Sequence, residues 1–366
     1  MPDTLQYQIA LTLIPGVGAI NAKKLIGYCG GVEAIFREKK SALVKIPGIG
    51  PCIAESVLGN DVLGRAEQEV EFIAKNKIRT HFYLDAEYPS RLRHCEDGPI
   101  LLFTKGEVNL DAEKVVGVIG TRNMTDYGRD KCEEIVRGLI PHDALIVSGL
   151  AYGVDSCAHK TALDFGLKTV AVLGHGLDRI YPPINTALAR RIEVQGALIT
   201  DFVSETKPDR ENFPKRNRII AGLCDAVLVI EAAESGGALI TADIANSYNR
   251  DVFALPGRTT DTFSKGCNTL IKTNKANLLE SIADIEYIMA WSKKGKQKPR
   301  QHTLFAELDP NETRVVNFLR ENAESSIDYM VANLGLTVGQ TSAILLVLEF
   351  KGVVKQLPGK IFKLSV

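Results

Sequence analysis

The stretch VVGVIGTRNMTDYGRDKCEEIVRGLIPHDALIVSGLA, residues 115–151, decides the fold of this chain. It holds two short apolar runs, VVGVIG (115–120) and ALIVSGLA (144–151), on either side of a helix-length amphipathic segment. A short apolar run without polar alternation is typical of a strand that is buried on both faces, and a helix between two such runs is typical of parallel strands. The stretch therefore predicts a parallel sheet covered by helices.

The same pattern continues along the chain. Helix-length segments separate four further apolar runs, which are TVAVLG (169–174), ALIT (197–200), AVLVIEA (226–232) and DVFALPG (251–257). Because crossovers between parallel strands are right-handed, this order predicts an α/β domain with a Rossmann-like, doubly wound parallel sheet over residues 76–290. Ligands of such sheets bind beyond the carboxyl ends of the strands, so the candidate site lies in the segments that follow these runs.

One of these segments, FPKRNRIIAGLCDA (213–226), is a candidate phosphate-binding helix. Its basic side chains can donate charged hydrogen bonds to phosphates, and its aromatic ring can stack on a base. The alternative is a basic run that only faces solvent. We favour phosphate contact because the run begins a helix that leads into an apolar strand. The candidate DNA contacts of this segment are Phe213, Lys215, Arg216, Asn217 and Arg218.

A glycine turn, Ser235-Gly236-Gly237, opens the next helical pattern, ALITADIANSY. Backbone N–H groups at the start of a helix, together with the helix dipole, can hold an anion. The alternative is that the glycines only allow close packing of strand and helix. We favour anion binding at this turn.

The N-terminal part of the chain repeats itself, as IPGVGAINAKKL (14–25) and IPGIGPCIAESV (46–57). A recurring segment of this size usually means one supersecondary unit used twice. Helical patterns flank each Pro-Gly turn, as in a helix-hairpin-helix, whose glycines leave backbone N–H groups open to a phosphate. A role in packing alone is equally compatible with the pattern. We predict a helical helix-hairpin-helix (SAM-like) domain over residues 1–75.

The C-terminal part differs in composition from the rest. Residues 291–303 include KKGKQKPR and predict a basic linker. Residues 304–366 contain three amphipathic helical segments followed by a turn and strand, an order that resembles a winged helix. A DNA-reading winged helix would carry Arg or Lys at the start of its third helix, where this chain has TVGQT (337–341). We therefore predict a structural or protein-contact role for this domain.

Composition and charge limit the possible function classes. The 44 Lys and Arg residues balance the 44 Asp and Glu residues, so nucleic-acid binding must come from charge that is placed locally. The chain begins without the pattern of a secretory signal, and no segment approaches the roughly 20 apolar residues of a membrane span. Scattered cysteines and histidines, without a CxxC or HExxH motif, predict a cytoplasmic protein with no metal site. No GxGxxG or P-loop motif is present, and no cofactor is expected.

Taken in order, these segments resemble the DprA/Smf family of bacterial DNA-processing proteins over roughly residues 80–285. The resemblance implies sequence-independent binding of single-stranded DNA by a homodimer. It also implies hand-over of the strand to the RecA recombinase, past single-strand-binding protein, during natural transformation of competent cells. It assigns DNA contacts to Arg122, Arg216 and Arg218, with Phe213, Ser235-Gly236-Gly237 and Lys265 beside them. The segments that carry it are GTR (120–122), SGLAYGVDSCAH (148–159), VLGHGLDRIYPP (172–183), FPKRNRIIAGL (213–223), SGGALITADIA (235–245) and LPG…KGCNTLI (255–271).

The alternative class is an enzyme, a Rossmann-type nucleotide phosphoribohydrolase. Such enzymes need a PGGxGT helix with an arginine and a glutamate, whereas here SGGALIT follows Glu231 and Glu234. Asp155 and His159 have the spacing of an acid–base pair on a helix. We favour local roles, with Asp155 capping the helix and His159 bonding nearby. No activated nucleophile is evident, so we predict a protein without catalytic residues.

Overall fold

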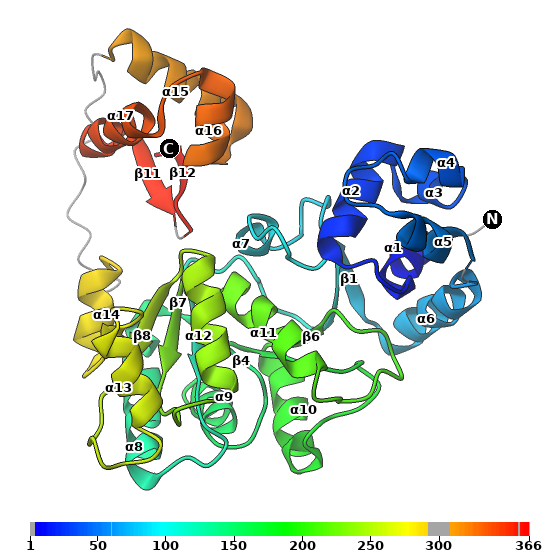
Figure 1. Ribbon diagram of the computed structural model, residues 1–366. Helices are drawn as coiled ribbons and strands as arrows, with labels where there is room; N and C mark the ends of the chain where they lie inside the picture. The colour runs from blue at the N-terminus through cyan, green and yellow to red at the C-terminus, as the bar shows by residue number, and fades with distance from the viewer. Residues whose placement is uncertain (1–3, 60, 292–307, 358, 366) are drawn as a thin grey trace. The chain divides into compact units, whose positions relative to one another are not determined.

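The computed structural model describes residues 4–59, 61–291, 308–357 and 359–365 (Figure 1). The chain forms two compact units, Met1–Trp291 and Ser292–Val366, each with its own hydrophobic core. The segment for which we predict a basic linker, 291–303, lies outside the described residues except for Trp291. The boundaries of our four-part division remain predictions.

A nine-stranded sheet forms the centre of the first unit, in the order β1-β2-β6-β5-β4-β3-β7-β8-β9. The pairs from β6 to β9 are parallel, and β1 and β2 are added antiparallel at one edge. All six predicted runs are strands, so the parallel core is confirmed; β1, β2 and β9 were not predicted. The strands are β1 (Arg79–Phe82), β2 (Leu101–Gly106), β3 (Val115–Ile119), β4 (Leu145–Ser148), β5 (Thr169–Val172), β6 (Ala197–Thr200), β7 (Ala226–Val229), β8 (Asp251–Ala254) and β9 (Asn277–Leu278).

Helices cover both faces of this sheet because side chains alternate between faces along each strand. In β3, Val115 and Ile119 join the core under α11, α12 and α13, whereas Val116 and Val118 join the core under α8, α9 and α14. The helices of this part are α7 (Ser90–Arg93), α8 (Asp126–Gly138), α9 (Val154–Asp164), α10 (Thr186–Gln195), α11 (Asn212–Leu223), α12 (Gly237–Ser247), α13 (Lys265–Lys272) and α14 (Ile282–Ile288), with short 3-10 turns at Ile140–His142 and Pro183–Asn185.

The strand order contains one topological switch point. From β3 the chain winds through β4 and β5 to β6 on one side, and then returns to place β7, β8 and β9 on the other side. The helices that leave β3 and β7 therefore diverge, and a crevice forms beyond the carboxyl ends of these two strands. This is the place where a doubly wound sheet binds its ligand.

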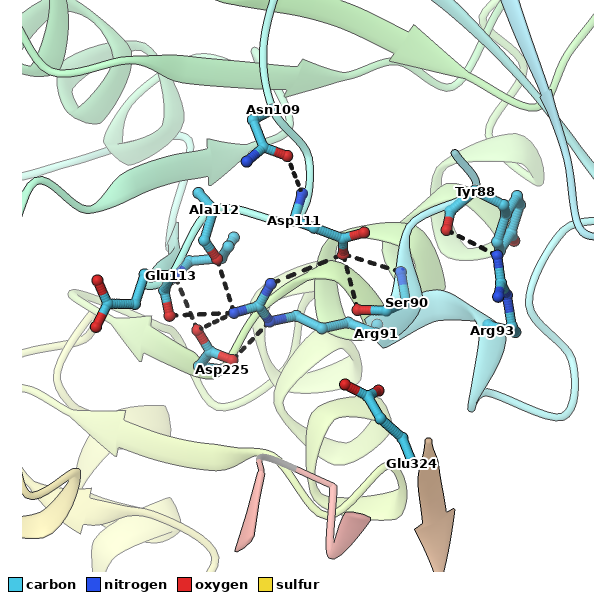
Figure 2. A network of polar contacts seen from close by, with 12 residues as sticks. Tyr88, Ser90, Arg91, Arg93, Asn109, Asp111, Ala112, Glu113, Asp225 and Glu324 are labelled. Atoms are coloured by element: carbon cyan, nitrogen blue, oxygen red, sulfur yellow. Dashed lines mark hydrogen bonds and ion pairs between the residues drawn. The ribbon is translucent and has the colours of Figure 1, made fainter. Parts of the chain in front are cut away.

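A buried ion pair links Arg91 of α7 to Asp225, which directly precedes β7, at the amino ends of β3 and β7 (Figure 2). The Arg91 guanidinium donates two hydrogen bonds to the Asp225 carboxylate, at 2.6 and 2.9 Å, and one to the Ala112 carbonyl at 2.9 Å. The same carboxylate accepts the Val115 backbone N–H at 2.8 Å. Bidentate, charge-assisted bonds fix direction as well as distance, so the pair fixes α7 against the start of β7, and the Val115 bond adds β3 to the same network.

The N-terminal helices pack on the antiparallel edge of the sheet, because their core continues into Phe82 of β1 and into Leu101 and Phe103 of β2. The two repeats form equivalent turns between helices, with φ of 80° at Gly16 and 86° at Gly48, where glycine is favoured. The assignment of these turns as helix-hairpin-helix motifs remains a prediction. The helices are α1 (Thr4–Leu13), α2 (Ala19–Cys29), α3 (Val32–Ile35), α4 (Lys40–Leu43), α5 (Pro51–Gly59) and α6 (Leu63–Asn76).

The second unit is a winged helix, as predicted. Three helices pack against a small antiparallel sheet of order β10-β12-β11. Its core includes Val315, Leu319, Met330, Leu345 and Leu348. The elements are α15 (Pro310–Asn322), β10 (Glu324–Ser326), α16 (Ile327–Leu334), α17 (Val338–Phe350), β11 (Val354–Leu357) and β12 (Ile361–Leu364).

Within the described ranges, no single helix is long and apolar enough to cross a membrane; α16 and α17 reach that length only together and are bent by 114°. In the same part of the chain, no three His, Cys, Asp or Glu side chains come together as metal ligands. The seven cysteines are all free thiols.

Candidate nucleic-acid interface

A pocket of about 390 Å³ opens at the switch point, beyond the carboxyl ends of β3 and β7. It brings together seven of the ten predicted site residues from three separate segments of the chain. They are Arg122, Phe213, Arg216, Asn217, Ser235, Gly236 and Gly237.

The other three predicted residues do not line this pocket. Lys215 and Lys265 are exposed at the starts of α11 and α13. Arg218 is partly buried, and donates hydrogen bonds to the Asp97 carbonyl at 2.6 Å and to the Asp201 carboxylate at 2.9 Å. Residues two apart on a helix point to different sides, so Arg218 cannot join Arg216 at the pocket.

Arg216 lies at the floor of the pocket and is only 5% exposed. Its guanidinium donates hydrogen bonds to the carbonyl oxygens of Gly149 and Val172. Burial lowers the pKa of Arg216 to about 10, against the attraction of Asp155, so the side chain keeps its charge at neutral pH. A Cβ at Gly149 would come within 2.7 Å of both guanidinium nitrogens and of the Asp155 carboxylate. The first glycine of SGLAYG therefore makes room for this charge pair.

Asp155 and His159 make separate local contacts. The expectation that Asp155 caps its helix is wrong, because Gly153 stands at that position and the Asp155 carboxylate instead accepts the Ala151 N–H at 3.2 Å, within the preceding loop. His159 bonds nearby, as expected, with Nδ1 2.7 Å from the Thr169 hydroxyl. Burial, with a smaller effect of Arg216, lowers the pKa of His159 to about 3, so the ring is neutral.

The Phe213 ring lies close to two positive charges at one wall of the pocket. The guanidinium carbons of Arg122 and Arg216 lie 5.6 and 5.9 Å from its centroid. A Cβ at Gly174 would come within 3.0 Å of the ring, so the first glycine of GHG gives Phe213 its position. Arg122 is exposed. An aromatic face beside an accessible guanidinium suits a base and its phosphate.

The Ser235-Gly236-Gly237 turn forms part of the rim of the pocket. Gly236 has φ of 151° and directly precedes α12, whose first backbone N–H groups point out of the helix start. Asn217 reaches this turn from α11, with Nδ2 3.5 Å from the Gly237 carbonyl. All three residues of the turn are exposed at the pocket mouth, where an anion can approach them.

Glu231 organises the pocket, although sequence reasoning considered it only for the enzyme alternative. Its carboxylate accepts hydrogen bonds from the Thr125 N–H at 2.9 Å and the Thr125 hydroxyl at 2.5 Å, and its carbonyl accepts the Thr121 N–H at 2.7 Å. It thereby ties the loop that carries Arg122 to the end of β7. The signal in the sequence is Gly128, where a Cβ would come within 2.3 Å of this carboxylate.

Comparison with known proteins places this chain in a family of DNA-processing proteins. The family model described as DNA recombination-mediator protein A matches residues 79–289, and that of the DprA winged helix domain matches residues 299–360. Protein Smf from Synechocystis sp. is 32% identical over 96% of this chain and 97% of its own length. DNA processing protein A (DprA) from Streptococcus pneumoniae has a crystal structure with a TM-score of 0.67 and 34% identity, over 77% of this chain and 97% of that one. DNA processing protein A from Helicobacter pylori, for which a single-stranded DNA binding mode is described, gives a TM-score of 0.53 and 28% identity, over 58% of this chain and 96% of that one.

Proposed function

The chain belongs to the DNA recombination-mediator protein A family, and from this we propose that it binds single-stranded DNA without sequence preference and loads RecA recombinase onto incoming strands during natural transformation. The single-stranded DNA binding mode of the Helicobacter pylori relative supports the first part of this proposal. The observation that carries it for this chain is the pocket at the switch point, which combines accessible positive charge, an aromatic face and the start of a helix.

In the proposed complex, Arg122 and the N–H groups of Ser235–Gly237 bind phosphates, and a base lies against Phe213. The buried charge of Arg216 attracts the backbone from the pocket floor, and Asn217 holds α11 and the glycine turn together. None of these contacts reads a base edge, which is why binding should be indifferent to sequence. Lys215 and Lys265 are exposed beside the pocket and serve as outer phosphate contacts, while Arg218 positions α11 through Asp201.

We also propose that the protein works as a homodimer in the cytoplasm, on strands covered by single-strand-binding protein. This part of the proposal rests on the resemblance to the family alone. Sedimentation of the full chain at micromolar concentration should give a dimer, and a monomer alone would contradict this part.

We do not favour the alternative function, that of a nucleotide phosphoribohydrolase. Asp155 and His159 are buried and engaged in separate local bonds, so they offer no paired acid and base to a substrate. Turnover of mononucleotides by the purified protein would reverse this conclusion.

The first test is fluorescence anisotropy of a labelled oligo-dT and of its duplex at two salt concentrations. We expect tighter binding of the single strand, with log K falling by about 0.7 per neutralised phosphate for each tenfold rise in salt. Arg122→Ala should cost about 1.5 kcal/mol, since it removes one charge-assisted contact, and should reduce the salt slope by about 0.7.

Arg137→Ala is the matched control for this experiment. Arg137 is an exposed arginine in the last turn of α8, paired with Glu133, and its loss changes the net charge equally. The Arg137→Ala variant should bind oligo-dT with the affinity of the wild type. Salt-independent binding, or equal behaviour of the two variants, would overturn the proposed function. Arg216→Ala is less suitable because it leaves the Asp155 carboxyl buried without its counter-charge.

A further inference from the structure

A second aromatic ring stands next to the pocket without lining it. The Tyr181 ring centroid lies 6.0 Å from that of Phe213, with the two planes tilted by 36°. Tyr181 is 38% exposed, and Ile184, one 3-10 turn further along, is 75% exposed. The apolar wall that Phe213 begins therefore continues outward past the carboxyl end of β5.

The loop that carries Tyr181, residues 174–185, is held firmly on both sides. Near its start, the Asp178 carboxylate accepts the Glu205 N–H at 2.9 Å. At its end, Asn185 Nδ2 donates to the Leu150 carbonyl at 2.8 Å and to the Ser156 hydroxyl at 2.9 Å. A loop fixed in this way has little conformational freedom left to lose when the ring that it carries binds a base.

The spacing of the two rings decides how they can be used. A base inserted between two parallel rings needs about 6.8 Å, twice the 3.4 Å stacking distance of nucleic-acid bases. At 6.0 Å and with a tilt, Tyr181 and Phe213 leave no such gap and instead form neighbouring parts of one apolar surface. Successive bases of a single strand can lie along such a surface, since every base has a face that stacks.

We propose that Tyr181 is a second base-stacking platform, which receives the base next to the one on Phe213. The single strand then leaves the pocket at β3 and β7, passes Phe213, and continues over the end of β4 toward β5 and Tyr181. This path rests on the proposed function, and it adds a contact that depends on the base rather than on the phosphate.

The experiment compares two strands of equal length, a labelled oligo-dT and a fully abasic strand with the same phosphates. Tyr181→Leu removes the ring and should weaken binding of oligo-dT about tenfold, within the range known for one base–aromatic contact. It should leave the affinity for the abasic strand and the salt slope unchanged, because phosphate contacts are intact. Tyr181→Phe keeps the ring and should retain wild-type affinity for both strands.

Tyr287→Leu is the matched control. Tyr287 is 87% exposed on α14, a helix that packs on the C-terminal end of α8 through Ile282 and Gly138, far from the carboxyl ends of the strands. The Tyr287→Leu variant should bind oligo-dT and the abasic strand as the wild type does. Equal weakening of both strands by Tyr181→Leu would mean that the ring only supports the fold around Phe213, and would overturn the proposal, as would no weakening at all. If the proposed function itself were wrong, the wild type would bind both strands without salt dependence, a result that does not involve the Tyr181 variants.

Discussion

His159 is a buried, neutral ring on α9, one turn after the pocket-lining Asp155, and its bonding fixes its tautomer. The Thr169 hydroxyl donates its only proton to the Ile146 carbonyl at 2.9 Å, so His159 Nδ1 must carry the hydrogen that it shares with that hydroxyl. Nε2 is buried and has no hydrogen-bond partner among the described residues. Protonation would therefore place a charge in an apolar site near Arg216, which is why the pKa is low.

This predicts a loss of stability in acid. The pKa of His159 falls from its ordinary value of 6.5 to about 3 on folding, so between these values the unfolded chain binds one more proton than the folded chain. The free energy of unfolding should then fall by about 1.4 kcal/mol per pH unit below 6.5 from this residue. His159→Asn keeps a donor for Thr169 but does not titrate. Urea midpoints measured between pH 7.5 and 5 should fall less steeply for the variant, and parallel curves would contradict the assignment.

The basic segment at 213–218 shows what sequence reasoning can and cannot reach at this scale. Its chemistry was predicted, and the structure brings Phe213 and Arg216 to the pocket. The sequence could not show that Arg216 is buried while Arg218 turns toward Asp201, because charge spacing does not reveal which side of a helix faces the sheet. The role of Glu231 was missed for a different reason, because it depends on contact with Thr125, far away in the chain.

At the scale of elements, six of the seven parallel strands were predictable because helices bury both of their faces, which leaves continuous apolar runs; the seventh, β9, has only two residues. The antiparallel pair escaped this reasoning. β1, with the sequence RTHF, has only Phe82 fully buried and carries no such run. β2 begins with the short apolar run LLF (101–103), but it precedes the alternation of strands and helices by which the other strands were recognised. The switch point also depends on strand order, which follows from the sequence only through the fold that it resembles.

The Arg91–Asp225 ion pair, between α7 and the start of β7, should contribute strongly to the stability of the sheet. Removing one partner leaves the other charge buried, and we expect Arg91→Ala to lower the free energy of unfolding by about 3 kcal/mol. Arg79→Ala is the matched control, because the Arg79–Glu107 pair is largely exposed and such pairs contribute about 0–1 kcal/mol. Urea unfolding of both variants checks the difference, and equal midpoints would contradict it.

At the scale of the whole molecule, the separate cores of the two units define two folding units. The winged helix has its own buried cluster, and the parallel sheet has others on its two faces. The sequence indicated this division through the basic segment and the return of helical periodicity after it. It did not indicate that the N-terminal helices share a core with β1 and β2.

Thermal unfolding should therefore show two transitions. Leu319→Ala, in the core of the winged helix, should cost about 2–5 kcal/mol and lower only one midpoint, by roughly 10 °C or more. Leu346→Ala removes the same atoms from an exposed position on α17 and should have little effect. Calorimetry of both variants, with anisotropy at 25 °C, tests this. A shift of both transitions in Leu319→Ala would show that the units unfold as one.

The hydrogen bonds of Glu231 and Asn185 have a consequence for rates. They fix the loops that carry Arg122 and Tyr181 before any strand arrives, so no slow rearrangement stands between encounter and capture. Because the positive and negative charges of the chain balance, its long-range electrostatic attraction for a DNA strand is weak. Capture should then proceed at the ordinary diffusion-governed rate of about 10⁵–10⁷ M⁻¹ s⁻¹ for nearly any strand. Strands should therefore differ in the lifetime of the complex, which under the proposed function is the interval available for hand-over to a recombinase.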